Sequence, residues 1–233
     1  MKENKKAILE ILQKNSKKNS KFDELVLNLA LQKISGEHFE YDDQAVYSAD
    51  HKRMIYCLYE GENFEIPEGV EIIGQKAFYK KKNLRHVTIP SSVISIEKDA
   101  FTGCDSLEMV NLPASVERIE SFAFSDCGTL KTVNFEGVPK HLSRHSFEES
   151  ERLANIIVPS GTVKKFRKAL HFDDGDMDYI VVDRDIVEAD AADGLKKKAD
   201  RAKLNKEDHL KSSDEKEKSP GNLSGKKKKK GKD

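Results

Sequence analysis

Apolar and polar positions in the middle of the chain recur at a constant spacing of 23 residues. An alanine-phenylalanine pair marks each copy most clearly, and single aliphatic residues keep the same spacing around it. The pairs are Ala77-Phe78, Ala100-Phe101 and Ala123-Phe124, weakening to Ser146-Phe147. The aliphatic columns are Ile73, Ile96, Ile119 and Leu142; Leu84, Leu107, Leu130 and Leu153; and Val87, Val110, Val133 and Ile156. Because several independent columns hold one register without insertions, the middle of the chain is predicted to be a repeat structure.

Each column has a physical role in such a structure. Leu84, Val87 and Ile89 are expected to point inward from a short strand, and Pro90 ends that strand because it cannot donate a ladder hydrogen bond. The alanine-phenylalanine pair is expected on a helical or 3₁₀ turn, where the small residue permits close approach and the aromatic ring fills the centre of the coil. One unit cannot bury this face alone, whereas stacked units can. The pattern therefore predicts an α/β solenoid whose parallel strands lie about 4.8 Å apart.

The two ends of the chain follow other patterns. Residues 2–13 and 22–33 are predicted to be helical, the second because apolar residues fall at i, i+3, i+4, i+7 and i+8 behind an N-cap candidate, Ser20. Leucines that alternate from Leu25 to Leu31 leave a strand as the alternative there. From Gly194 onward four leucines are the only large apolar residues, too few to offset the entropy of ordering the chain.

These patterns divide the chain into three predicted regions. Residues 1–45 form an N-terminal helical cap, residues 46–182 form the repeat domain, and residues 183–233 form a disordered, lysine-rich tail.

The repeat reads as leucine, valine and isoleucine-proline, followed by isoleucine-glycine, alanine-phenylalanine and a cysteine before the next leucine. The matching residues include Ile73-Gly74, Ala77-Phe78, Gly103-Cys104 and Leu107. This pattern resembles the BspA-like leucine-rich repeat family, also called the Treponema pallidum type, from about Val46 to about Val182. The resemblance implies a leucine-rich repeat horseshoe with an opening hairpin at 47–56, a closing turn and cap helix from Val158 to Phe166, and a last strand from Tyr179 to Val182. Family members are mostly interaction and adhesion proteins, often secreted or displayed on the cell surface.

In such a horseshoe the variable strand residues point outward on the concave face, since successive side chains of a strand alternate between its two faces. The first outward column is Asn63, His86, Met109, Thr132 and Asn155, and the second is Glu65, Thr88, Asn111, Asn134 and Ile157. These mostly neutral polar residues are the candidate site for a protein partner, with Met109 and Ile157 as apolar positions. The alternative is a solvated sheet face without a partner.

The total charge of the chain is uninformative, but its distribution along the sequence is uneven. The 41 basic and 41 acidic side chains cancel. Residues 1–20, however, carry six lysines and two glutamates, and residues 183–233 carry 16 basic and 12 acidic side chains. The repeat region between them is therefore acidic. The run Lys226, Lys227, Lys228, Lys229 and Lys230 offers an alternative function, nonspecific association with RNA or an anionic membrane surface. A solubilising tail is the other interpretation of this run.

The sequence shows no apolar run approaching the about 18 to 20 residues of a spanning helix, and no evident signal peptide. A cytoplasmic location is therefore expected, or a nuclear one in a eukaryote. Surface display as an adhesin is a further alternative that would need an export route not visible in the sequence.

No pattern predicts an enzyme, a cofactor or a metal site. His141 and His145 lie four residues apart, and an acidic loop spans residues 173–178, yet neither has the spacing of a known ligand set. Cys104 and Cys127 share one repeat column, at a spacing that would allow an inter-rung disulfide in an oxidising environment. Two buried thiols that act as small hydrophobic residues are the favoured interpretation, because the cysteine count is odd.

Overall fold

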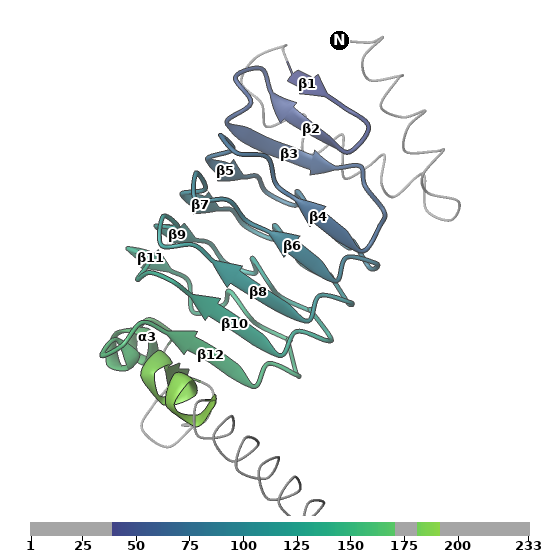
Figure 1. Cartoon of the computed structure of the whole chain (residues 1–233). Helices are drawn as coiled ribbons and strands as arrows, with labels where there is room; N and C mark the ends of the chain where they lie inside the picture. Colours follow the sequence, from purple (N-terminus) through teal and green to yellow (C-terminus); the bar gives the residue numbers. More distant parts are fainter. Residues whose placement is uncertain (1–38, 171–180, 192–233) are drawn as a thin grey trace, which may run out of the picture. The chain divides into compact units, whose positions relative to one another are not determined.

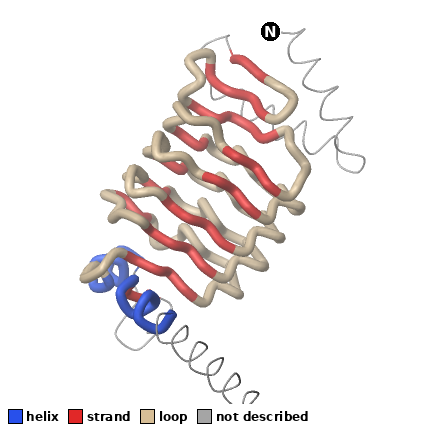
Figure 2. The backbone as a smooth tube through the Cα atoms, in the orientation of Figure 1, coloured by secondary structure: helices blue, strands red, loops and turns tan. Residues whose placement is uncertain are grey.

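The computed structural model describes residues 39–170 and 181–191 (Figure 1). The chain divides into two compact units, Met1–Ile186 and Val187–Asp233, and every strand given below belongs to the first. The predicted helices at 2–13 and 22–33, the acidic loop at 173–178 and the Lys226 to Lys230 run all fall outside the described residues. Within the described part, helix is found only near the C-terminal end, whereas strands and turns follow one another through the repeats (Figure 2).

The solenoid opens with an antiparallel meander of three strands, β1 (Phe39–Tyr41), β2 (Ala45–Ser48) and β3 (Arg53–Cys57). The predicted hairpin corresponds to β2 and β3. Strand β1 lies in the segment assigned to the helical cap, but pairs with β2 instead. The turn before β2 is fixed by Asp42, whose carboxylate accepts hydrogen bonds from the N–H groups of Gln44 and Ala45.

Short parallel strands continue the sheet from β3 along one side of the coil. They are β5 (Ile72–Ile73), β7 (Ser95–Ile96), β9 (Arg118–Ile119) and β11 (His141–Leu142). The sheet order is β1-β2-β3-β5-β7-β9-β11, and Ile73 pairs with Ile96, which in turn pairs with Ile119. The predicted aliphatic column thus forms the buried side of this sheet.

Longer strands form the opposite side of the coil (Figure 1). They are β4 (Asn63–Glu65), β6 (His86–Thr88), β8 (Met109–Leu112), β10 (Thr132–Phe135), β12 (Asn155–Val158) and β13 (Val181–Asp183). Strand β4 pairs with β6, and a second group runs in the order β13-β12-β10-β8; all of these pairs are parallel. We call the outward surface of these strands the long-strand face.

Hydrogen-bonded turns connect the two sides, and they also bond from rung to rung. The N–H of Phe78 donates to the carbonyl of Ala100, at 2.7 Å, and the N–H of Phe101 donates to the carbonyl of Ala123, at 2.8 Å. The predicted helical turn is a set of isolated i to i+3 turns, because Lys76 (φ 62°) and Lys80 (φ 57°) adopt left-handed backbone conformations that a right-handed helix excludes. The repeats are therefore those of a β-solenoid.

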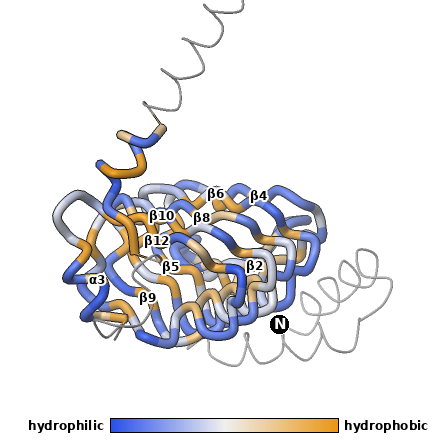
Figure 3. Tube along the Cα trace, turned by 90° about the horizontal axis from the view of Figure 1, so that it is seen from below, coloured by the Kyte–Doolittle hydropathy of each residue, from blue (hydrophilic) through white to orange (hydrophobic). Residues whose placement is uncertain are grey.

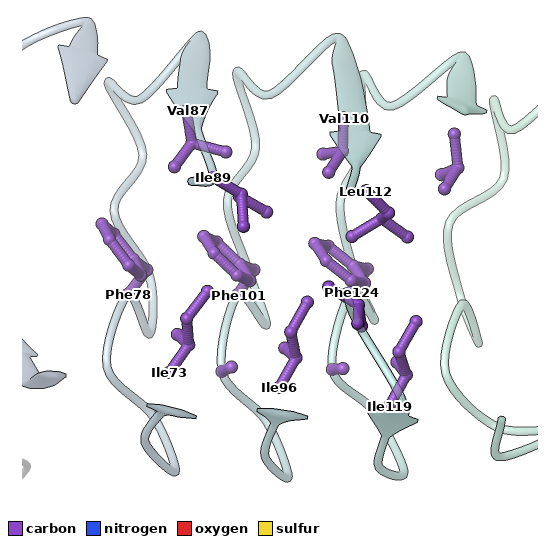
Figure 4. Close-up of a cluster of buried hydrophobic side chains, with 14 of the residues drawn as sticks. Ile73, Phe78, Val87, Ile89, Ile96, Phe101, Val110, Leu112, Ile119 and Phe124 are labelled. Carbon is purple, nitrogen blue, oxygen red and sulfur yellow. The ribbon is translucent and has the colours of Figure 1, made fainter. Parts of the chain in front are cut away.

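A column of stacked phenylalanine rings fills the centre of the coil (Figure 4). The ring centroids of Phe78 and Phe101 are 4.6 Å apart, those of Phe101 and Phe124 are 4.9 Å apart, and the planes differ by less than 10° in both pairs. Phe147 extends the stack at 5.8 Å even though its copy of the repeat is the weakest. Seen from below, the coil contains both hydrophobic and hydrophilic segments (Figure 3).

A second buried column contains small donor side chains. The thiols of Cys104 and Cys127 donate to the carbonyls of Phe78 and Phe101, at 3.2 and 3.3 Å. In the next copy the hydroxyl of Ser150 donates to the carbonyl of Phe124, at 2.8 Å. Because a hydroxyl makes the same contact as the thiols, the cysteines act here as small buried donors.

The C-terminal end of the coil is closed by helix α3 (Val163–Leu170), which buries Phe166 and Leu170. This is the predicted cap helix. The ring of Phe166 meets that of Phe135 edge to face at 4.7 Å, so the helix packs on the last long rungs. Residues 184–191, expected in the tail, are helical, and the Asp183 carboxylate accepts hydrogen bonds from the N–H groups of Gly161 and Asp185.

Gly74 packs directly against the opening hairpin. A Cβ atom there would lie 2.7 Å from the carbonyl oxygen of Met54, a backbone atom that cannot move aside. Gly74→Ala is therefore expected to lower the free energy of unfolding by about 1 to 3 kcal/mol, the usual cost of overpacking. Urea unfolding of the full chain, followed by circular dichroism, measures this change.

Gly128→Ala is the matched control, because its added Cβ would have open space around it. We expect that variant to stay within about 0.5 kcal/mol of the parent chain, as surface substitutions usually do. Equal effects of the two substitutions would contradict the steric role of Gly74.

Candidate partner-binding face

The long-strand face carries the two predicted outward columns in register. Thr132 pairs with both Met109 and Asn155, Asn134 pairs with both Asn111 and Ile157, and on the first rungs Asn63 pairs with His86. Inward neighbours such as Val110 and Val133 are buried, so the alternation of a strand places the two columns outside.

Exposure along these columns is uneven. Seven of the ten residues are exposed, namely Asn63, Glu65, His86, Thr88, Met109, Asn111 and Asn155. Thr132, Asn134 and Ile157 are half-buried. Met109 is 45% exposed, one of four exposed large apolar side chains among the described residues. It lies on β8, next to the half-buried positions of β10.

The half-burial of Asn134 has a cause that the repeat pattern does not contain. Arg184, which follows β13, reaches back to β10 and donates through Nη2 to the carbonyl oxygen of Phe135 at 2.6 Å and to Asn134 Oδ1 at 3.3 Å. In the preceding rung, the corresponding carbonyl, of Leu112, accepts the N–H of Glu136. The residue that would do the same for Phe135 is Pro159, which has no N–H, so the guanidinium supplies the donor.

One buried charge lies away from this face, near the start of the coil. Lys81 is 3% exposed and occupies the repeat column of Cys104 and Cys127. Its Nζ donates to Glu60 Oε1 at 2.6 Å and lies 5.0 Å from the centre of the Tyr56 ring. The pair replaces the small donor of later copies. The 23-residue register places Lys81 in that column, but nothing in the sequence pattern indicates a buried ion pair there.

The two histidines considered for a metal site lie on different elements. His141 is in β11, and His145 is in the following turn, where its Nε2 accepts a hydrogen bond from Arg144 Nε. The other ring nitrogen, Nδ1, therefore carries the proton and donates to Glu148 Oε2 at 3.0 Å. Within residues 39–170 and 181–191 no group of three or more His, Cys, Asp or Glu side chains could hold a metal ion.

The three cysteines are free thiols, and all are buried. The inter-rung disulfide between Cys104 and Cys127 is not formed. Burial raises the pKa of the Cys57 and Cys127 thiols from the ordinary 9.0 to about 12, and it raises that of Cys104 well above 9.0. None of them is poised as a nucleophile, since the reactive species is the thiolate.

The family is decided by the repeats themselves. The family model for the BspA type leucine-rich repeat region matches residues 53–174, just over half of the 233-residue chain, as six copies. The chain belongs to this family. Leucine-rich repeat solenoids of this kind are generally non-enzymatic protein-interaction scaffolds, and the described fold agrees with that class. No functionally curated protein matches the chain significantly.

Several solved bacterial structures are similar to parts of this chain. A leucine-rich repeat protein from Eubacterium ventriosum is 25% identical, with a TM-score of 0.50, over 52% of this chain and 33% of that one. The pneumococcal vaccine antigen PcpA is 17% identical, with a TM-score of 0.43, over 64% and 48% of the two chains. The leucine-rich repeat protein of T. pallidum is 18% identical, with a TM-score of 0.30, over 62% and 97%. The chain thus spans about a third of the Eubacterium protein and about half of PcpA.

Among the described residues no helix is long and apolar enough to cross a bilayer. The cytoplasmic or nuclear location expected from the sequence stays a prediction. Because members of the family are often associated with the cell surface, surface display also stays an alternative.

The buried thiols give a direct chemical test of the repeat core. At about pH 8, a pKa near 12 leaves the thiolate roughly a thousandfold scarcer than an ordinary cysteine would. We expect no reaction of the folded chain with Ellman's reagent on the timescale at which all three cysteines react in concentrated guanidinium.

The count in denaturant also decides the redox state. Three reactive thiols agree with free cysteines, whereas a single one would indicate that two of the three cysteines are bridged. Rapid reaction of the folded chain would contradict the burial of the column.

Proposed function

We propose that this protein binds a protein partner through its long-strand face. The observation that supports this most strongly is Met109, an exposed apolar side chain at the middle of two registered columns of neutral polar groups. Interfaces commonly combine an apolar anchor with surrounding hydrogen-bonding groups and a polar rim. The neighbouring Thr132, Asn111 and Asn155 supply such groups.

The charge on the face favours a protein over a polyanion. Among the ten candidate residues only Glu65 can be negatively charged and only His86 can become positive, and both lie on the first two rungs. The residues just before β8 and β10, Glu108 and Lys131, form a long ion pair of 3.8 Å, and their charges cancel. Even with the guanidinium of Arg184 beside Asn134, the face carries little net positive charge, so it gives a polyanion little electrostatic reason to bind there.

Two alternatives carry different experimental signatures. Polyanion association through Lys226 to Lys230 predicts binding that falls with salt and with deletion of this run, and that does not depend on Met109. Surface adhesion would use the same long-strand face but requires the protein to be exported.

Met109→Glu is expected to weaken partner binding at least about tenfold, because a charge at an apolar anchor must be desolvated on binding. The full chain serves as bait in an extract of the source organism, and the captured protein is then titrated against purified parent and variant.

Ile94→Glu is the matched control, since Ile94 is 43% exposed but precedes β7 on the short-strand side. We expect it to bind the partner as the parent does. Equal binding by Met109→Glu and the parent, or an equal loss in both variants, would rule out the long-strand face as the site.

A further inference from the structure

Two hydrogen bonds on the long-strand face run in series from Arg184 to Asn134 and from Asn134 to Asn111, each residue donating to the next. A guanidinium can only donate, so the Asn134 side-chain atom that faces Arg184 at 3.3 Å must be the oxygen, Oδ1. The nitrogen of the same amide then faces β8 and donates to Asn111 Oδ1 at 3.4 Å. Arg184 thereby fixes the orientation of the Asn134 amide, which in turn donates to Asn111.

Arg184, the first donor in this series of hydrogen bonds, is held more firmly than the two asparagines that follow it. Arg184 Nη2 holds the Phe135 carbonyl at 2.6 Å, a short charge-assisted bond to the oxygen that Pro159 leaves without a ladder donor. Arg184 is itself half-buried, and Asp183 before it is held by the N–H of Gly161 at 2.8 Å. The guanidinium is therefore positioned by backbone groups of the coil.

We propose that Arg184 is a positioning residue that sets the hydrogen-bond direction of the long-strand face, so that Asn111 presents its amide N–H groups to the partner. This inference rests on the proposed protein-binding function and adds the chemistry of the partner. Among the described residues Asn111 Nδ2 has no hydrogen-bond partner, and Asn111 is exposed.

The partner chemistry follows from the neighbours of that amide. Met109 lies two residues before Asn111 on the same strand, and the two side chains therefore share the outward face. A fitting partner is an extended peptide segment that places a carbonyl oxygen over Asn111 and an apolar side chain on Met109. A segment that offers an N–H group at this point would meet another donor.

The orientation can be measured without any partner. In the full, isotope-labelled chain, the side-chain amide resonances of Asn111 and Asn134 are compared by NMR between parent and Arg184→Met. We expect both amides to shift, although Asn111 does not contact Arg184, because the direction passes through Asn134. Arg152→Met, an exposed arginine with no role in the column, is the control and should shift neither.

A second variant keeps the test decisive if Arg184→Met loosens the end of the coil. Asn134→Asp still accepts from Arg184 but can no longer donate, so the Asn111 amide should shift while the backbone spectrum of β12 and β13 is retained. If Arg184→Met leaves the Asn111 amide unchanged, or if Asn134→Asp does so, the proposed direction is wrong.

Peptide binding tests the consequence for recognition. Short linear peptides displayed on phage are selected on the full chain, and those that no longer bind Met109→Glu are kept. Loss of one oriented hydrogen bond should weaken their binding to Arg184→Met about tenfold, with Arg152→Met unaffected. Unchanged affinity would overturn the inference. If no selected peptide depends on Met109, the proposed function and its partner chemistry fail, whereas the NMR comparison by itself decides whether Arg184 orients the column.

Discussion

The stacked phenylalanine column is the interaction on which the rest of this structure depends. A single rung has two short strands and too little apolar surface to hold a fold, so its register is set by its neighbours. Phe78, Phe101 and Phe124 stack with nearly parallel rings, and the same residues donate backbone hydrogen bonds to the next rung. Ring stacking and backbone bonding thus fix the offset between rungs at one central position. The strands on both sides of the coil therefore have the same offset.

The long-strand face follows from that constraint. With the rungs in register, the strand residues that alternate with the buried valines align on the outside. Met109 lies beside Thr132 of the next strand and two residues before Asn111 on its own strand. The direction of hydrogen bonding along the face then comes from the other end of the coil, where Pro159 leaves a carbonyl free and Arg184 occupies it. In the proposed function, recognition depends both on the repeated strands and on Arg184, which has no equivalent in the repeats.

The same distinction separates what the sequence could predict from what it could not. Leu84, Val87 and Ile89 were predicted to point inward, and all are buried, because a strand face and a fixed period determine them. The opening hairpin and the closing helix were likewise predicted through the family pattern. Arg184 was not, since its contacts span 49 and 50 residues and its position had been assigned to the tail. The left-handed backbone of Lys76 and Lys80 was missed as well, because neither residue type signals it.

Native-state hydrogen exchange on Phe101→Leu tests the central claim most directly. The substitution keeps an apolar side chain but removes two ring stacks, worth roughly 1 kcal/mol each beyond burial. If the column sets the register of the whole rung, protection should fall together at the turn and at Val110 and Val133 on the long strands, while β2 and β3 keep theirs. Loss of protection confined to the turn around Phe101 would contradict this account, because the strands would then hold their register without the ring stack.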